Sequence, residues 1–542
     1  MLKRKRICQS RRYYIVSLNS KMKNKIIVSF FLLLISISAF SQLYVFSKAE
    51  MKKYIEADVY YESGFYHLAL PIYDNLLKLD SLNKDLNYKF GVCLFQKNDR
   101  SIKTLSYFEN ATEEYPNSRY YMAKIYHYNE QFDKAITEFD TYKNNVQIDV
   151  MDQDIEYFKQ KSIYAKKMYA EPENLNIKNL GKIINTQYNE YVPLITTDDS
   201  TLLFTSRREG SIGGLDPNGE YYEDIYVSKK IGAEWAIPEN IGEPINSATH
   251  DATVSISSDG KKLYIYRTNK DLSGGDIYES IFTANKWTKP IKMKGDINCK
   301  YCWNASGALS PDENVFYFSS NKPGGFGGKD IYKIVKLPDG KWSKATNLGE
   351  TINTKYDEDA PFMHPDGETF YFSSKGHENM GEYDIFVSKL NIDGNWAKPK
   401  NVGHPINTAK DDIFFVVSAN GKKAYYSSEK ESGFGKNDIY EVEMLENPSN
   451  YVMLRGAITS KNPDVEKVEA EITITDLSTN KIHGIYRTTT DSQKYVFVLL
   501  PYRKYKLKVE SQGYQTYEYE IDLTEKLKVQ DLFKSIVLEK TN

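Results

Sequence analysis

The sequence predicts a multidomain protein in which an α-helical solenoid is followed by an all-β part, a β-propeller and a C-terminal β-sandwich. Three observations predict it: the spacing of the apolar residues, the recurrence of short motifs and the length of the chain. With 542 residues, of which 41% are hydrophobic, the chain is long enough for three or four domains. It has only four cysteines, which excludes a scaffold held together by disulfides.

The first 41 residues have the composition of an export signal. They contain nine basic residues and no acidic one, and they include the apolar run Ile26–Phe40. This run is short for a transmembrane helix, and the small residues Ala39 and Ser41 fit cleavage after position 41. We expect translation to begin at Met22 and the mature chain to be exported, with a membrane anchor as the alternative.

Residues 50–170 carry apolar and aromatic residues at helical spacing. Small residues recur at Ala57, Gly91 and Ala123, in steps of 34 and 32 residues. Small residues at fixed places let paired helices approach closely, with aromatic side chains between them. We expect about three helix pairs and a final amphipathic helix over Gln153–Tyr169. A generic helical bundle is the alternative.

Residues 175–447 change to short strands separated by Gly, Asn, Asp and Pro. The motif Asp-Ile-Tyr or Asp-Ile-Phe begins at five positions, in steps of 52, 54, 54 and 54 residues: Asp224, Asp276, Asp330, Asp384 and Asp438. A tryptophan follows each of the first four after eleven or twelve residues: Trp235, Trp287, Trp342 and Trp396. Repeats of this length with four strands each have the size of propeller blades.

The two ends of this repeat predict how the ring closes. The pair Ile-Asn occurs five times, and its first copy, Ile184-Asn185, comes before any of these tryptophans or Asp-Ile-Tyr motifs. The fifth Asp-Ile-Tyr motif, in turn, lacks the tryptophan and the strand that should follow it. We therefore expect Leu175–Lys182 to supply the outer strand of the last blade, because a closed ring leaves few unpaired strand edges. Five blades are expected, with six as the alternative.

Residues 451–540 form a third module of short strands. Six segments have the composition of strands: Val452–Gly456, Ala470–Ile474, Tyr495–Leu499, Tyr505–Val509, Tyr517–Ile521 and Lys534–Leu538. Six or seven strands in so short a stretch predict a small β-sandwich.

The repeated motifs do not suggest a catalytic site. The five aspartates might be taken for a metal or acid–base ring, but a residue repeated in every blade is better explained as an acceptor for backbone N–H groups in Gly-rich turns. The tryptophans are expected to pack within the blades. The sequence has no Gly-x-Ser-x-Gly elbow, zincin histidine pair, phosphate-binding loop or dinucleotide fingerprint. We expect no catalytic residue, metal or cofactor.

Cys299 and Cys302 are the one pair with redox or metal-binding potential. An oxidising compartment would allow them to form a local disulfide. The alternatives are free thiols that contact a partner, or a redox or metal site, although no second CxxC or histidine pair lies nearby in the sequence. Cys93 falls in a predicted helix and is expected in its core.

The blade motifs Gly324–Tyr332 and Trp396–Gly403 resemble those of TolB-like, WD-repeat-like propellers. The helical part resembles tetratricopeptide (TPR) repeats, and the C-terminal module resembles the carboxypeptidase regulatory-like domain. The three in this order are similar to the PorE-like, OmpA-family periplasmic proteins of Bacteroidetes, which implies a link to type IX secretion and gliding. Two features depart from that family. No lipobox cysteine is visible, and the chain ends at Asn542, where an OmpA-like domain would begin, so peptidoglycan binding is doubtful.

Motifs and resemblance together predict a non-enzymatic scaffold in the periplasm, associated with the outer membrane. Its partners would be envelope proteins, foremost a PorP/SprF-like membrane protein. Four helical tyrosines would line a partner groove: Tyr60, Tyr61, Tyr88 and Tyr126. The Gly-rich loops Glu209–Glu223 and Asn321–Lys329 would present a second surface. Beyond its basic first 41 residues the chain is mildly acidic, which argues against nucleic-acid binding.

Two alternative functions stay open at this point. In one, the propeller is a receptor that holds a glycan or small ligand on aromatic residues at its central pore. In the other, the protein is a divergent hydrolase that uses carboxylates of the propeller loops.

Overall fold

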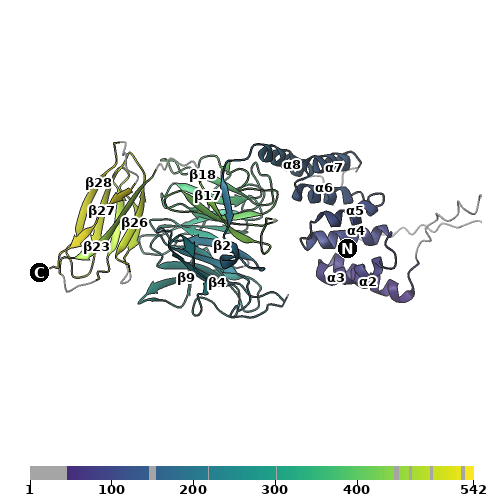
Figure 1. The fold of residues 1–542 in the computed structure, drawn as a ribbon, viewed down its shortest axis with the longest axis horizontal. Helices are drawn as coiled ribbons and strands as arrows, with labels where there is room; N and C mark the ends of the chain where they lie inside the picture. Colours follow the sequence, from purple (N-terminus) through teal and green to yellow (C-terminus); the bar gives the residue numbers. More distant parts are fainter. Residues whose placement is uncertain are drawn as a thin grey trace, which may run out of the picture. The chain divides into compact units, whose positions relative to one another are not determined.

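The computed structural model describes residues 45–145, 154–217, 219–300, 302–430, 432–444, 451–462, 467–488, 492–525 and 531–541 (Figure 1). The chain divides into two compact units, Met1–Lys97 and Asn98–Asn542, which are described separately. The expected export signal in residues 1–41 lies outside the described residues. Within the described ranges, no helix combines the length and the apolar character needed to cross a membrane.

The first unit contains three described helices: α2 (Lys48–Glu62), α3 (Tyr66–Leu77) and α4 (Lys84–Gln96). Helix α2 begins with a capping box, in which the Ser47 hydroxyl accepts from the N–H of Glu50 and the Glu50 carboxylate accepts from the N–H of Ser47. Ala57 of α2 and Ala69 of α3 are completely buried. The small residues therefore lie where paired helices need to approach closely.

The second unit begins with a 3-10 turn, η1 (Ile102–Thr104), and four helices: α5 (Leu105–Ala111), α6 (Ser118–Tyr128), α7 (Phe132–Asn145) and α8 (Ile155–Ala170). Ala123 of α6 and Ala135 of α7 are completely buried in one cluster with Phe139 and Tyr142. Helix α8 begins two residues after, and ends one residue after, the bounds predicted for the final helix.

Residues 176–443 form a ring of antiparallel sheets. The first sheet contains β2 (Glu190–Ile195), β3 (Thr201–Ser206), β4 (Asp224–Ile231), β5 (Glu234–Trp235) and β6 (Glu239–Asn240). The second contains β7 (Asp251–Ile256), β8 (Lys262–Thr268), β9 (Gly275–Thr283), β10 (Lys286–Trp287) and β11 (Ile291–Lys292). The third contains β12 (Gly307–Leu309), β13 (Val315–Ser320), β14 (Asp330–Val335) and β15 (Thr346–Asn347).

The fourth sheet contains β16 (Glu358–Met363), β17 (Thr369–Ser374), β18 (Asp384–Lys389) and β19 (Lys400–Asn401). The fifth contains β20 (Asp412–Val417), β21 (Lys423–Ser428), β22 (Asp438–Glu443) and β1 (Asn176–Asn179). The first strand of each sheet contacts that of the next, and β2 also contacts β20. The described part of the ring thus closes with five sheets.

Strand β1, which comes first in this part of the chain, closes the ring by pairing with its last strand. It pairs antiparallel with β22, with Asn176 opposite Glu443 and Asn179 opposite Tyr440. The segment expected to complete the last sheet therefore does so, although the strand ends at Asn179 and not at Lys182. Residues Gly181–Ile184 form the short helix α9 instead, and the N–H of Gly181 donates to the Asn179 side chain at 2.8 Å.

The repeated tryptophans lie where neighbouring sheets meet. Trp235 of the first sheet contacts Tyr425 of the fifth, with ring centroids 6.2 Å apart. Trp396, from the fourth sheet, contacts Tyr317 of the third at 6.1 Å. Trp287 packs against the first sheet and Trp342 against the second. These side chains fill the spaces between sheets, where apolar burial stabilises the ring.

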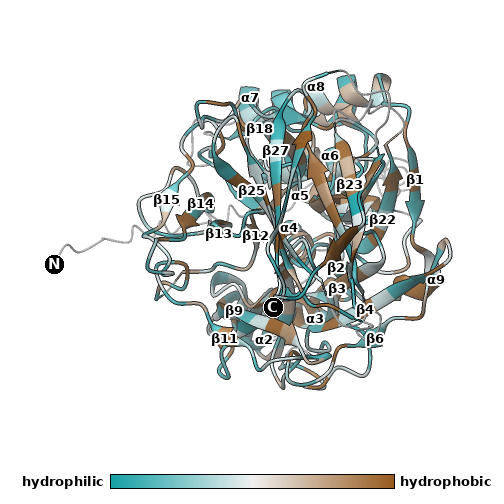
Figure 2. Ribbon diagram, turned by 90° about the vertical axis from the view of Figure 1, so that its left-hand side faces the viewer, coloured by the Kyte–Doolittle hydropathy of each residue, from teal (hydrophilic) through white to brown (hydrophobic). Residues whose placement is uncertain are grey.

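The C-terminal module consists of eight described strands in two sheets. One sheet contains β23 (Val452–Ser460), β26 (Lys494–Leu499), β29 (Asp531–Phe533) and β30 (Ile536–Leu538). The other contains β24 (Glu471–Asp476), β25 (Lys481–Arg487), β27 (Lys504–Glu510) and β28 (Tyr517–Asp522). Residues of both sheets share one core. Figure 2 shows strands that carry both apolar and polar segments, as expected where one face is buried.

The sandwich differs from the sequence-based expectation in two strands, β25 and β29. Strand β25 was not among the predicted segments, because it contains Gly484 and follows the turn residue Asn480, whose φ is 54°. Strand β29 (Asp531–Phe533) lies outside the predicted segments as well, and of the predicted Lys534–Leu538 only Ile536–Leu538 forms a strand, β30.

Candidate functional site

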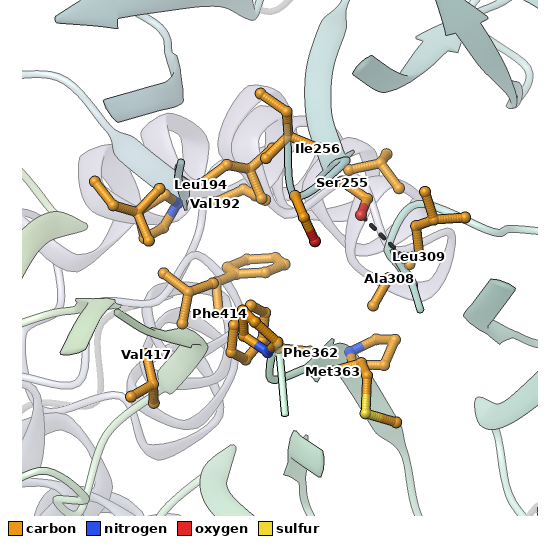
Figure 3. A pocket seen from close by; sticks show the side chains of 18 of the residues that line it. Val192, Leu194, Ser255, Ile256, Ala308, Leu309, Phe362, Met363, Phe414 and Val417 are labelled. Carbon is orange, nitrogen blue, oxygen red and sulfur yellow. Dashed lines mark hydrogen bonds between the residues drawn. The ribbon is translucent and has the colours of Figure 1, made fainter. Parts of the chain in front are cut away.

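The inner strands of the five sheets enclose a small central cavity of about 70 Å³ (Figure 3). Its lining is mostly apolar, with Leu194, Leu309 and Phe362, and also includes hydroxyl-bearing residues such as Ser255 and Ser306. None of the described residues that line it has an acidic or basic side chain. Ligand pockets usually measure ~300–1,000 Å³. The central cavity is therefore smaller than an ordinary ligand pocket.

One end of this cavity is covered by the sandwich. Thr197, Ser258 and Pro311 line the cavity, and they also border a small space lined by Ile485 of β25 and Phe497 of β26. The N–H of Ile485 donates to the carbonyl of Pro311 at 3.1 Å. The sandwich therefore lies against the rim of the pore on this side.

The five repeated aspartates do not converge on one site. Asp384 accepts hydrogen bonds from the N–H of Met380 and from the Asn401 side chain, both at 2.7 Å. Asp224, Asp330 and Asp438 have the same two kinds of donor. In the second sheet a lysine replaces the asparagine, and Lys292 pairs with Asp276 at 2.7 Å. Across the described ranges, no cluster of three or more His, Cys, Asp or Glu residues suits a metal ion.

A second set of repeated carboxylates, missed in the sequence, holds the turns between sheets. Four of them are completely buried, five residues after the asparagine of an Ile-Asn pair: Glu190, Asp251, Glu358 and Asp412. Glu358 accepts from the N–H and hydroxyl of Thr354, both at 2.7 Å, and from the Ser374 hydroxyl at 2.6 Å. The signal was Ile-Asn-Thr/Ser-x-x-x-Asp/Glu, in which two of the positions vary.

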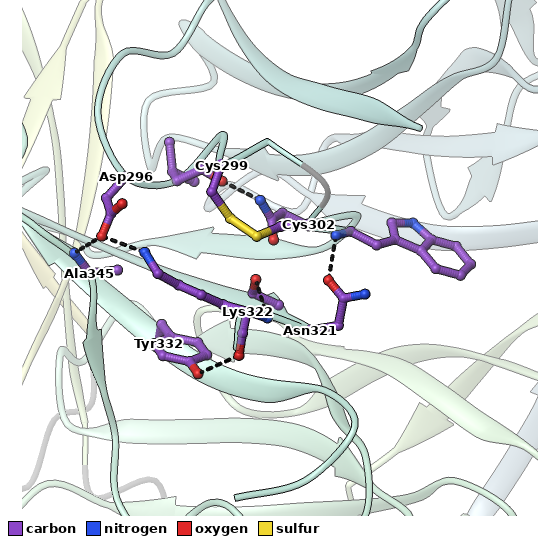
Figure 4. The surroundings of a disulfide bond; sticks show 11 residues. Asp296, Cys299, Cys302, Asn321, Lys322, Tyr332 and Ala345 are labelled. Atoms are coloured by element: carbon purple, nitrogen blue, oxygen red, sulfur yellow. Dashed lines mark hydrogen bonds and ion pairs between the residues drawn. A yellow bond between two sulfur atoms is a disulfide. The ribbon is translucent and has the colours of Figure 1, made fainter. Parts of the chain in front are cut away.

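The third of these turns carries the cysteine pair instead (Figure 4). Cys299 follows Asn298 at the position that holds Thr or Ser in the other four turns, and it forms a disulfide with Cys302. The N–H of Cys302 donates to the Cys299 carbonyl at 3.2 Å, and the N–H of Trp303 donates to the Asn321 side chain at 2.7 Å. The disulfide thus holds covalently a turn that a hydroxyl–carboxylate pair holds elsewhere.

The turn carboxylates give the ring a testable pH dependence. Burial raises the pKa of Glu358 from 4.5 to about 7. The native state therefore binds more protons than the unfolded chain between these two values, and stability falls as pH rises through about 7. We expect Glu358→Gln, which cannot titrate, to be more destabilising at about pH 5.5 than at about pH 8.5, by on the order of 2 kcal/mol.

Chemical denaturation of both proteins at the two pH values measures this difference. The exposed Glu350 provides the control, since Glu350→Gln at a surface position should cost less than about 1 kcal/mol. The comparison with wild type is needed because buried histidines titrate in the opposite sense: burial lowers the pKa of His127 from 6.5 to about 4. An equal cost of Glu358→Gln at both pH values would contradict the prediction.

The four tyrosines expected in a partner groove are divided between the two units. Tyr60 and Tyr61 lie on α2 and Tyr88 on α4 of the first unit, all half-buried. Tyr126 lies on α6 of the second unit. Only the first three therefore belong to the same compact unit.

A larger cleft of about 420 Å³ lies between the first two sheets of the ring and the sandwich. Its aromatic lining comes from both parts, with Phe282 and Trp287 from the ring and Tyr486 from the sandwich. The rings of Phe282 and Trp287 are 5.2 Å apart and nearly edge to face. Charged side chains also line it: Asp198, Lys229, Glu239, Asp259, Lys261, Arg487 and Lys494.

A buried ion cluster fixes one wall of this cleft. Arg487 of β25 pairs with Asp259 at 3.0 Å and with Glu313 at 2.7 Å, two residues from different sheets of the ring. Burial alone would raise the pKa of Glu313, but Arg487 and Lys262 hold it below its usual range. Asp198 and Glu239, by contrast, are exposed. The cleft thus combines a rigid charged wall with polar groups open to solvent.

Comparison with known proteins gives structural matches alone. No model of a known protein family matches the chain, and no curated protein does. A glycoside hydrolase matches with 7% identity and a TM-score of 0.36, covering 52% of this chain and 96% of that one. A thermostable family-43 glycoside hydrolase matches with 12% identity and a TM-score of 0.35, covering 49% and 93%. The putative TolB from Agrobacterium tumefaciens matches with 16% identity and a TM-score of 0.28, covering 50% and 98%.

These matches correct one expectation from the sequence. The prediction that the protein is not an enzyme is withdrawn, since glycoside hydrolases stand among the matched structures and the fold does not exclude activity. None of the findings supports the PorE-like family. Identities this low concern the fold alone, so we argue function from the residues of this chain. The chain is mostly β, with many antiparallel sheets, and the solved structures that match it include a TolB-like propeller and glycoside hydrolase propellers.

Proposed function

We propose that the protein binds a carbohydrate in the cleft between the ring and the sandwich. The observation that carries this proposal is the half-buried Trp287 in a cleft that also contains carboxylates and lysines. A sugar ring has an apolar C–H face and a rim of hydroxyl groups. An aromatic face packs against the former, and charged side chains accept from or donate to the latter. The cleft has the volume of an ordinary ligand pocket.

The rigid parts of the cleft favour binding as well. Arg487, Asp259 and Glu313 hold the sandwich wall against the ring. On the ring side, Asp198 accepts from the hydroxyls of Thr196 and Ser200 at 2.6 and 2.7 Å, which fixes the turn at the mouth. A preformed site loses less conformational freedom when a ligand binds.

Trp287→Ala is expected to weaken carbohydrate binding at least about tenfold, because it removes the aromatic face of the cleft. A glycan array with the full chain identifies the tightest ligand, and calorimetry then compares wild type and variant. Trp303→Ala is the matched control, since Trp303 is 54% exposed and lies outside the lining of the cleft. Unchanged affinity in Trp287→Ala, or no binding to any glycan of the array, would refute the proposal.

The same cleft supports hydrolysis as a second candidate function. Two carboxylates are the usual requirement for cleaving a glycosidic bond, and Asp198 and Glu239 both line the cleft. Release of new reducing ends from the bound glycan measures this activity. It should be lost in both Asp198→Asn and Glu239→Gln, and binding without turnover in wild type would leave the receptor function alone.

We further propose that the ring is a five-bladed, TolB-like propeller and that the helices are a TPR-like array. The five sheets support the former, and the buried alanines between paired helices support the latter. Export to the periplasm, association with the outer membrane, the link to type IX secretion and a PorP/SprF-like partner stay predictions from the sequence. Recovery of an envelope protein with the purified chain would support them.

A further inference from the structure

In four of the sheets, the Gly-rich loop before the repeated aspartate contains an apolar residue whose N–H donates to that aspartate. We call these the tip residues: Ile212, Phe326, Met380 and Phe434. The four donor–acceptor distances lie between 2.6 and 2.8 Å. The tip residues differ in exposure. Met380 is completely buried, whereas Phe326 is 52% and Phe434 39% exposed.

The Met380 tip is buried by helices of the same unit. Met380 packs in one cluster with Phe132 of α7 and Ala165 of α8. A nitrogen of the His127 ring lies 2.9 Å from the Met380 carbonyl oxygen, and the Lys161 ammonium donates to the Gly381 carbonyl at 2.7 Å. The tip thus inserts an apolar side chain between helices, which also bind its backbone carbonyls.

The acidic residue next to this tip is complementary in charge to basic residues of the helical part. Glu382, two residues before Asp384, pairs with Arg100 at 3.0 Å. Burial would raise the pKa of Glu382, but Lys124, Arg100 and Lys161 hold it well below its usual range. The helices therefore present basic residues to an acidic tip.

The Phe434 tip repeats this geometry with the opposite charge. The N–H groups of Phe434 and Gly435 donate to Asp438 at 2.7 and 3.0 Å. A side chain at Gly435 would collide with the carbonyl of Tyr188, so the loop is held rigidly against the first sheet. At the position of Glu382, two residues before the aspartate, the fifth sheet has the exposed Lys436.

The surroundings of Phe434 extend this surface. Lys182 of α9 lies over the Phe434 ring, 5.9 Å from its centroid, and the next residue, Ile183, is 49% exposed. The third sheet offers no such charge, because Gly328 stands at the corresponding position. Apolar groups and two lysines therefore meet at the Phe434 tip.

We propose that the Phe434 tip docks a pair of α-helices of another protein, which carries acidic residues where α6–α8 and Arg100 are basic. The helical occupant is inferred from the Met380 tip, whose N–H donates to its aspartate at the same 2.7 Å and whose side chain packs against α7 and α8. The acidic character is inferred from charge complementarity, since the exposed Lys436 stands at the position of Glu382 and Lys182 lies over the Phe434 ring. Shape and charge thus specify the same kind of partner.

Site-specific photo-crosslinking tests the proposal. The full chain, with benzoylphenylalanine in place of Phe434, is expressed in the cells that naturally make it, and the crosslinked peptide is identified by mass spectrometry. We expect a peptide from a helix pair with Asp or Glu beside the crosslink. Lys436→Glu should reduce the yield at least about tenfold, while Lys436→Arg should keep it within about twofold.

The same experiment has clear contrary outcomes. A crosslink to a second copy of this chain, to a strand or loop, to lipid, or to nothing would overturn the proposal. So would equal yields in Lys436→Glu and Lys436→Arg, provided that both variants unfold at the wild-type temperature. The proposal does not depend on carbohydrate binding, and Trp287→Ala should leave the crosslink unchanged.

Discussion

Replacing Asn176–Asn179 with a Gly-Ser segment of equal length is expected to destabilise the ring by on the order of 5 kcal/mol. The substitution keeps the connection to α8 but removes β1 from the edge of β22. It also removes the hydrogen bond from the Asn179 side chain to Asp438, which measures 2.7 Å, and the apolar contact of Ile177 with the core of the fifth sheet. The loss should appear as a lower and broader unfolding transition in calorimetry.

The matched control is the turn Asn391–Gly394, which joins β18 to the strand segment after it. Its side chains are exposed, Ile392 by 91%. A Gly-Ser replacement of this turn should change stability by less than about 1 kcal/mol. If both replacements had the same small effect, β1 would not close the ring in solution.

Arg487→Leu is expected to detach the sandwich from the ring, at a cost of about 3–5 kcal/mol. The side chain pairs with Asp259, whose side chain is 0% exposed, and with Glu313, at 6%. Removing the arginine leaves two buried carboxylates without their main counter-charge. Arg487→Lys should be intermediate, because lysine keeps the charge but not the planar fork that reaches two carboxylates. Separate unfolding transitions for ring and sandwich would report the detachment.

An exposed ion pair of the same sandwich gives the comparison. Lys461 and Glu539 lie 2.7 Å apart, but their side chains are 69% and 54% exposed. Lys461→Ala should therefore cost less than about 1 kcal/mol. A loss of similar size in Lys461→Ala and Arg487→Leu would show that burial does not set the strength of the sandwich contact.

The ring could be predicted from the sequence because each repeated residue makes the same local contact in its own sheet. Each Asp-Ile-Tyr motif begins a strand, and its aspartate binds an adjacent loop, so the same spacing recurs. The closing strand could also be predicted, since the first Ile-Asn pair precedes any complete sheet. The first inference rests on contacts within one repeat, and the second rests on the number of copies of each motif.

The parts that the sequence did not predict depend on variation or on distance. The turn carboxylates alternate between Asp and Glu and their donors between Thr and Ser, which hid the pattern. The cleft joins Trp287 of the second sheet to Tyr486 of the sandwich, and no local pattern links residues so far apart. Likewise, the sequence shows Met380 only as a loop residue, and its contact with α7 and α8 is visible only in the fold.

The disulfide between Cys299 and Cys302 makes one joint of the ring depend on oxidant, while the other four depend on protons. Reductants would loosen the connection between the second and third sheets and leave the remaining connections intact. A rise in pH above about 7 would weaken the other four connections, through carboxyl groups such as Glu358. A reductant would therefore weaken one of the five connections, whereas a rise in pH would weaken the other four.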